Sequence, residues 1–216
     1  MAVVCHDAQM LTDLIREERL ALVDRLGRVT DDEWSTPSLC EGWTVHMVLA
    51  HLATPFLVSR GEMMRTVTRR ASVAKAFDQH TRAIAASHSP AALIDVLRDH
   101  AATAFRPPGM PFEAPFTDIV AHNADIRWSL GDDHTYWDDP SRLTPALDFL
   151  TTPRARVGFV RAGAGRAVTL VADDVEWRHG TGAQATGPAL SLAMALLGRA
   201  AAYDDLRGSG VSVLQR

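Results

Sequence analysis

The stretch WSTPSLCEGWTVHMVLAHL, residues 34–52, joins a loop to an apolar helix and decides the fold of the N-terminal half. The proline and the glycine in its first half are typical of a loop. Thr44 can cap the helix that follows, which we expect to run to about residue 64. Because this helix is apolar around much of its circumference, it is typical of the buried centre of a helical bundle. Pro55 should kink or break it.

Helical patterns lie on both sides of this stretch. Before it, Leu11, Ile15 and Leu22 repeat at helical spacing between charged residues. After it, Ser89-Pro90 is typical of a helix start, and Gly131 is typical of a helix end. The expected helices lie at residues 8–27, 44–64, 73–86, 89–102 and 116–130, with a loop at 106–115. This half is therefore mainly α and packs as a bundle.

The pattern changes after GDDHTYWDDPSRLTP, residues 131–145, which is typical of a linker. RVGFVRA (156–162) and RAVTLVADD (166–174) alternate around a glycine turn and predict an antiparallel hairpin, which VEWRHG can extend. Gly187-Pro188 then opens a long apolar helix through residue 206. The expected domains are a helical bundle at residues 1–135 and a smaller α+β domain at residues 145–216.

Charge and composition restrict the classes of partner. With 22 basic and 26 acidic residues the formal net charge is -4, which offers no field to attract a phosphate backbone or anionic lipid. The N-terminus lacks a signal-peptide pattern, and no apolar run is long enough to span a membrane. Two cysteines without a CxxC pair favour the reducing cytoplasm. We therefore expect a cytoplasmic protein without nucleic-acid or membrane partners, and the oligomeric state stays open.

Asp118 and His122 are the first candidates for chemistry. Their spacing of four places both side chains on one helix face, about 5–6 Å apart at Cβ. His51 lies on the apolar helix, and antiparallel packing can bring it opposite this pair. Two histidines and one carboxylate are the ligands of catalytic zinc and of non-haem ferrous sites. Two alternatives stay open. His51 can be a buried histidine bonded to a carbonyl, and Asp118 can be a first-turn carboxylate that the helix dipole stabilises.

Other polar residues have simpler interpretations. Cys40 has no flanking base or helix N-terminus in the sequence to activate it, so a structural thiol is favoured. Asp125 and Arg127 can orient a ligand or simply pair at the helix end. His46 shares the face of His51 poorly. The five tryptophans are expected to be core anchors. Surface positions are expected for His6, His80, His88, His100, His134 and His179.

Three motifs extend this interpretation. Residues 34–52 resemble the "W…PS-C-GW-V-D-LAHL" signature of the mycothiol-dependent maleylpyruvate isomerase family, a branch of the DinB-like metal-binding bundles. FTDIVAHNADIRWSLG (116–131) is similar to the family's "E-x-x-x-H-x-x-D-I-R-x-x-LG" helix. The C-terminal run VTLVADDVEW…TGPALSLAMALLGRAAAYDDLRGSGV resembles the family's small domain. The resemblance implies a DinB-like four-helix bundle followed by a smaller α+β domain.

The resemblance also implies the functional residues. The family's metal ligands fall on His51, Asp118 and His122, with Asp118 in place of the usual Glu. The shorter side chain withdraws the carboxylate by about 1.5 Å, so either the helix lies closer or a water intervenes between Asp118 and the metal. Met47 replaces a commonly acidic residue, which removes a capping-box partner of the helix start. Arg199 matches an arginine that the family places near the active site, although a cation at a helix end is favourable anyway.

The function implied by the resemblance is metal-dependent thiol chemistry. A divalent cation, zinc above all, would bind the thiol of mycothiol, a small actinobacterial cofactor, and stabilise the thiolate. The thiolate would add to a conjugated double bond, and elimination after rotation would give the other isomer. Arg199 would hold one carboxylate of a dicarboxylate substrate. Two alternatives stay open: a mycothiol S-transferase acting on small electrophiles, and a non-catalytic regulatory module that binds metal or a small ligand.

Overall fold

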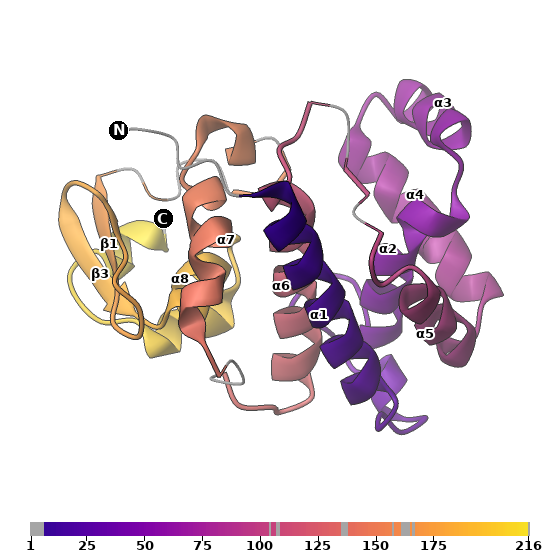
Figure 1. Ribbon diagram of the computed structural model, residues 1–216, viewed down its shortest axis with the longest axis horizontal. Helices are drawn as coiled ribbons and strands as arrows, with labels where there is room; N and C mark the ends of the chain where they lie inside the picture. Colours follow the sequence, from indigo (N-terminus) through magenta and orange to yellow (C-terminus); the bar gives the residue numbers. More distant parts are fainter. Residues whose placement is uncertain are drawn as a thin grey trace. The chain divides into compact units, whose positions relative to one another are not determined.

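Figure 1 presents a computed structural model of the protein. It describes residues 7–103, 105–106, 109–134, 138–156, 158–160, 165 and 167–215. The expectations for His6 and Trp137 lie outside these ranges. The fold class is confirmed, because a helical bundle is followed by a small α+β part. In the described part of the chain, no helix combines the length and apolarity needed to cross a membrane.

The N-terminal half is helical. Its elements are α1 (Ala8–Leu26), the 3-10 helix η1 (Glu33–Ser35), α2 (Val45–Leu57), α3 (Arg60–Arg70), α4 (Val73–Ser87), α5 (Pro90–Asp99) and α6 (Glu113–Ser129). Contacts divide the chain into two compact units: unit 1 holds residues 1–14, 106–121 and 132–216, and unit 2 holds 15–105 and 122–131. Helix α6 is continuous and contributes residues to both units. The predicted domain boundaries stay a prediction.

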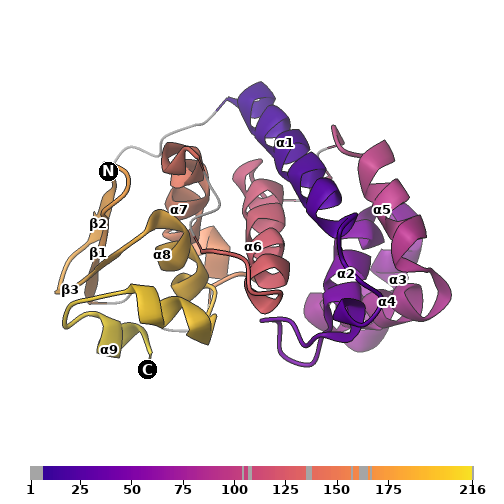
Figure 2. The ribbon, with the colours of Figure 1, turned by 90° about the horizontal axis from the view of Figure 1, so that it is seen from below.

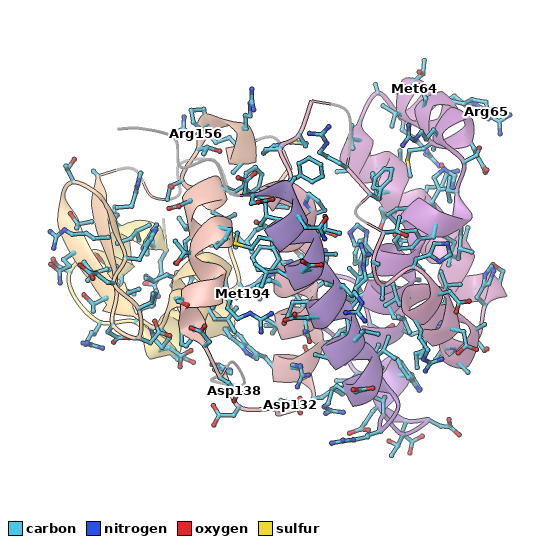
Figure 3. The ribbon with its side chains drawn as sticks, in the orientation of Figure 1. Met64, Arg65, Asp132, Asp138, Arg156 and Met194 are labelled. Carbon is cyan, nitrogen blue, oxygen red and sulfur yellow. The ribbon has the colours of Figure 1, made fainter. Side chains whose placement is uncertain are left out.

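Helix α2 begins where the sequence predicts and ends earlier. The Thr44 hydroxyl accepts a hydrogen bond from the Met47 backbone N–H at 3.3 Å, which confirms the cap. Pro55 lies in the last turn, where it removes only one helical hydrogen bond, so the helix continues to Leu57. Ser59 then caps α3, and the single helix expected through residue 64 is wrong. Met64 and Arg65 project from α3 (Figure 3), and both are exposed.

The core of unit 2 forms around α2. This helix packs against α4 and α5, with Val48 and Leu49 fully buried. His80 of α4 is also buried, and its Nε2 lies 3.0 Å from the hydroxyl of Thr66 on α3. The surface position expected for His80 is therefore wrong, because a hydroxyl from the neighbouring helix satisfies its imidazole.

Helix α6 begins three residues before the expected start, inside the predicted loop. Glu113 starts the helix and Pro115 lies in its first turn. A proline is tolerated there because the first backbone N–H groups of a helix have no intrahelical partner. At the other end, Gly131 adopts a φ of 79°, a left-handed conformation that favours glycine and ends helices.

The C-terminal part of unit 1 contains a small mixed sheet. Its elements are η2 (Pro140–Leu143), α7 (Thr144–Leu150), η3 (Pro153–Arg156), β1 (Val168–Ala172), β2 (Arg178–Gly180), β3 (Ala183–Gly187), α8 (Ala189–Leu196), η4 (Ala200–Asp205) and α9 (Val211–Leu214). The strand order is β2-β1-β3, with β1 antiparallel to β2 and parallel to β3 (Figure 2).

Two expectations for this part are wrong. Both edges of β1 are paired, with β2 and β3, so none of the described residues 156 and 158–160 pairs with it, and Phe159 packs edge-on against Phe149 of α7. By contrast, the linker expected at 131–145 stays a prediction, although this stretch includes η2 and the start of α7. The long helix ends at Leu196, because Gly198 adopts a φ of 84° and stops it.

Candidate metal centre

Two histidines from different helices meet in unit 2. His51 projects from α2 and His122 from α6, and their ring centroids lie 4.6 Å apart in an edge-on arrangement. His122 is buried, and His51 is half-buried. The prediction that helix packing brings His51 close to His122 agrees with this contact between the two rings.

Asp118 lies one turn before His122 on the same helix. His51, Asp118 and His122 form a group in which one ligand atom from each residue lies within 4.8 Å of the others. Because α6 begins at Glu113, Asp118 belongs to the second turn. The alternative of a first-turn dipole carboxylate is weakened, since the dipole effect falls off within the first turn. The assignment of the three residues as metal ligands stays a prediction.

Asp125 fixes the orientation of the His122 ring. Its side chain is fully buried, and its Oδ2 lies 2.9 Å from His122 Nδ1. When this carboxylate is ionised it only accepts hydrogen bonds, so Nδ1 then carries the ring proton and Nε2 keeps the lone pair. A carboxylate in this position orients a histidine ligand and raises its basicity. Of the two roles considered for Asp125, the structure favours orientation of His122.

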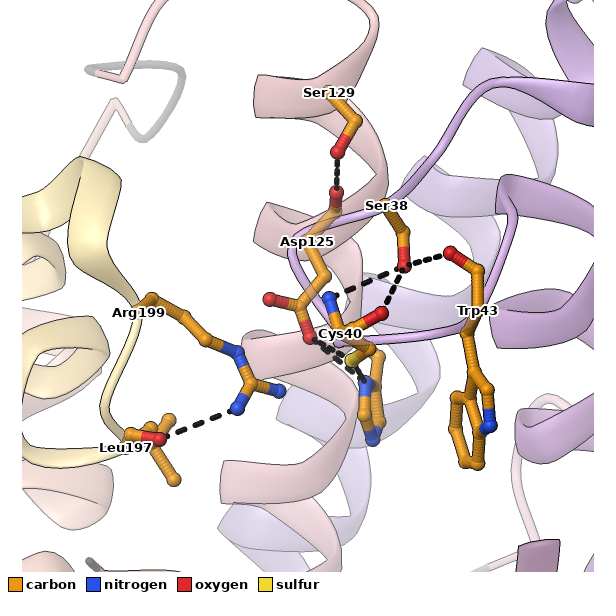
Figure 4. Close-up of polar contacts among 8 residues, drawn as sticks. Ser38, Cys40, Trp43, Asp125, Ser129, Leu197 and Arg199 are labelled. Atoms are coloured by element: carbon orange, nitrogen blue, oxygen red, sulfur yellow. Dashed lines mark hydrogen bonds and ion pairs between the residues drawn. The ribbon is translucent and has the colours of Figure 1, made fainter.

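Cys40 occupies the same side of the imidazole. Its Sγ donates to Asp125 Oδ2 at 2.9 Å and lies 3.6 Å from His122 Nδ1 (Figure 4). Local sequence does not predict this contact, because the two partners of Cys40 lie 82 and 85 positions further along the chain. The motif around residues 34–52 was a signal that this cysteine faces a site. Cys40, Asp125 and His122 form a second group with the spacing of metal ligands.

Hydrogen bonds within the loop hold Cys40 in place. The Ser38 hydroxyl accepts from the Cys40 backbone N–H at 3.1 Å and donates to the Trp43 carbonyl at 2.9 Å. The Trp43 backbone N–H donates to the Cys40 carbonyl at 3.0 Å. This closed turn, shown in Figure 4, sets the direction of the thiol before any ligand binds.

Aromatic side chains flank the histidines. The Trp43 ring lies 5.1 Å from the His51 ring, and Phe77 lies 5.6 Å from it, both measured between centroids. Trp43 Nε1 donates to Asp78 Oδ1 at 2.9 Å. Hydrogen bonds from Arg82 and from Trp43 hold the pKa of Asp78 below its ordinary value. The indole is thus anchored at its polar edge while its face contacts His51.

The two arginines singled out in the sequence have different surroundings. Arg127 donates through Nε to Asn123 Oδ1 at 2.8 Å, and Asn123 donates to Glu18 at 2.8 Å. This network joins α6 to α1 and gives Arg127 a structural role. Arg199 lies in unit 1 just before η4, where its Nη1 donates to the Leu197 carbonyl at 3.2 Å (Figure 4). The catalytic role expected for Arg199 stays a prediction.

The donor chemistry of the first group fits a divalent cation. Two imidazoles and one carboxylate provide three ligands and leave coordination positions for a water or a substrate atom. The same set accepts zinc or ferrous iron. In this arrangement Asp118 would supply the charge that balances the cation, while Asp125 acts behind His122.

Comparisons with known proteins agree with this architecture. Residues 15–115 match the model of the mycothiol maleylpyruvate isomerase N-terminal domain. A crystal structure of the mycothiol-dependent maleylpyruvate isomerase is similar, with a TM-score of 0.63, 17% sequence identity, and coverage of 94% of this chain and 93% of that chain. A mutant of the mycothiol-dependent isomerase with a histidine replaced by alanine gives a TM-score of 0.61 at the same identity and coverage. No curated protein matches the chain. At this identity the likeness shows the fold.

Proposed function

We propose a function for this chain from the premise that it belongs to the mycothiol maleylpyruvate isomerase family, whose N-terminal domain model matches residues 15–115. In our proposal the protein is a metal-dependent enzyme that uses mycothiol to isomerise a maleylpyruvate-like substrate, a dicarboxylate whose double bond is conjugated with a carbonyl. His51, Asp118 and His122 hold the metal ion, which we propose is zinc. Arg199 binds a substrate carboxylate.

One observation carries the proposal: the three prospective ligands gather with one donor atom each within 4.8 Å of the others. Asp118 takes part in this group although its side chain is shorter than that of Glu, which supports a site that still binds metal. The buried bond from His122 Nδ1 to Asp125 adds support, because it leaves Nε2 of His122 as the coordinating atom.

The roles of the residues follow from their contacts. When bound, a divalent cation stabilises a thiolate over a thiol and so supplies a nucleophile at neutral pH. With the second group free of metal, Asp125 keeps the His122 proton on Nδ1, so Nε2 stays available to the metal ion. Trp43 and Phe77 reduce the access of water to His51. Mycothiol, when bound, would supply the thiol whose reversible addition to the conjugated double bond allows rotation about that bond.

Metal analysis tests the site directly. We expect purified wild-type protein to hold about one equivalent of divalent metal. His51→Ala and His122→Ala should each lower the bound metal sharply while circular dichroism still shows a folded bundle. His88→Ala, a histidine outside the group, is the matched control and should retain the metal. Unchanged metal in both His51→Ala and His122→Ala would show that the site is wrong.

Turnover assays separate the function from its alternatives. We expect conversion of maleylpyruvate only when protein, metal and mycothiol are all present. Turnover of a chromogenic electrophile by protein and mycothiol, without isomerisation, would instead establish an S-transferase. Absence of bound metal, with no loss of stability on chelation, would favour the regulatory module.

A further inference from the structure

The Nδ1 side of His122 carries a second set of donor atoms. Cys40 Sγ and His122 Nδ1 each lie 2.9 Å from Asp125 Oδ2 and 3.6 Å from one another. We propose that these three side chains form a second cation site, selective for thiophilic ions such as Cd²⁺, Co²⁺ or excess Zn²⁺. Because this site shares His122 with the first group, we infer that its occupation opposes metal binding by His51 and Asp118.

The ligand types fit a thiophilic divalent cation. A thiolate, an imidazole nitrogen and a carboxylate together prefer zinc-like ions over magnesium or calcium. With metal–sulfur and metal–nitrogen bonds of about 2.3 and 2.0 Å, a tetrahedral ion separates the two donors by about 3.5 Å. The distance from Cys40 Sγ to His122 Nδ1, 3.6 Å, is close to this value. The two contacts to Asp125 are those of hydrogen bonds and would lengthen when a cation replaces the protons.

The movement of two protons when a cation binds explains why the two sites oppose each other. In the metal-free chain the Cys40 thiol and the His122 Nδ1–H both donate to Asp125. A cation that binds on this side displaces the thiol proton to solvent and moves the ring proton from Nδ1 to Nε2. His122 then has no lone pair at Nε2 for an ion held by His51 and Asp118. One proton leaves for each cation bound, and the imidazole stays neutral.

Burial and access support binding at this position. Asp125 is fully buried and His122 is buried, so both ligands are held rigidly by α6. Cys40 is half-buried, so it is the most exposed of the three ligands. The turn closed by Ser38 fixes the thiol in advance, so little conformational entropy is lost on binding.

Cobalt provides the test of the second site, because a thiolate bound to Co²⁺ gives a charge-transfer band in the near ultraviolet. We expect this band when the metal-free full-length protein is titrated with Co²⁺. It should be lost in Cys40→Ser and retained in Cys5→Ser, which replaces the chain's other cysteine. Circular dichroism checks that each variant is folded. A missing band in the wild type, or a band that persists in Cys40→Ser, would overturn the proposal.

The opposition between the sites rests on the proposed function and has its own measurement. After one equivalent of zinc, we expect about tenfold more Co²⁺ to be needed for the half-maximal band. In zinc-free His51→Ala, which lacks a ligand of the first group, the cobalt band should remain. If zinc binding is the same in His51→Ala and wild type, the proposed function loses its metal site while the cobalt band still supports the second site. An unchanged Co²⁺ requirement after zinc loading would refute the opposition.

Discussion

The two sides of the His122 ring differ in what occupies them. On the Nδ1 side, two protons already join Cys40 and His122 to a single buried carboxylate oxygen. In the other group, which we propose binds metal through Nε2, His122 joins His51 and Asp118 to make the donor set of a divalent ion. The difference shows how one imidazole can be held by protons on one edge and coordinate a metal through the other. The following predictions test this division.

Removal of the shared ring should have the largest effect. His122→Ala deletes a ligand from both groups, so we expect zinc affinity to fall by more than about 100-fold, beyond the range for loss of an outer partner. Competition with a chromogenic chelator measures the affinity. Retention of zinc within tenfold of the wild type would mean that His122 is not a ligand.

Loss of the buried carboxylate should have the next largest effect. Asp125→Asn removes the charge that orients His122 Nδ1–H, and we expect zinc affinity to fall by about 10–100-fold. The matched control is Ser129→Ala, which removes a hydroxyl that donates to the backbone carbonyl of Asp125. Equal zinc affinity in Asp125→Asn and Ser129→Ala would remove the orienting role.

A longer carboxylate tests the Nε2 side. Because Asp118 already lies within 4.8 Å of both histidine donors, Asp118→Glu should change zinc affinity by less than about tenfold and keep about one equivalent bound. Isothermal titration with zinc measures both quantities. If metal bound only to Asp118→Glu, the natural aspartate would instead indicate that this site has lost metal binding.

The thiol should matter little to the first group. Cys40→Ser keeps a donor toward Asp125, so we expect zinc affinity on the Nε2 side to change by no more than about fivefold. Chelator competition with one equivalent of zinc measures it. A loss as large as that of Asp125→Asn would show that both sides act as one unit.

Asp78 lies outside both groups and should show the smallest effect. Since Arg82 and Trp43 lower the pKa of Asp78, its contribution to stability is present at neutral pH and is lost as the pH falls through the lowered value. Asp78→Asn should therefore reduce the free energy of unfolding slightly at about pH 7, and less at about pH 3. Urea titrations at the two pH values measure the difference. An equal reduction at both would assign the effect to packing.

Local patterns in the sequence determined much of the bundle. The cap at Thr44, the start at Pro90 and the end of α6 at Gly131 each depend on residues within one turn of the helix terminus. The pairing of Asp118 with His122 is also local, because a spacing of four fixes the shared helix face. These features could be predicted because the interactions that create them join near neighbours in the chain.

Features decided by distant contacts escaped prediction. Nothing near Cys40 in the sequence indicates that its thiol reaches Asp125, 85 residues away. The antiparallel partner of β1 is β2, whereas Phe159 packs against Phe149 of α7 outside the sheet. Both contacts depend on tertiary packing rather than on neighbouring residues. His80 is buried because a hydroxyl on α3 satisfies its ring.

The sequence by itself thus determined most helices of the bundle, the change to an α+β pattern after it, and the three residues proposed to hold the metal. Only the tertiary structure decided that Asp125 and Cys40 lie behind His122, and so gave its two nitrogens different roles. The physical reason is that spacing along a helix fixes neighbours on one face. The tautomer of an imidazole, by contrast, depends on which acceptor the folded chain brings to its other edge.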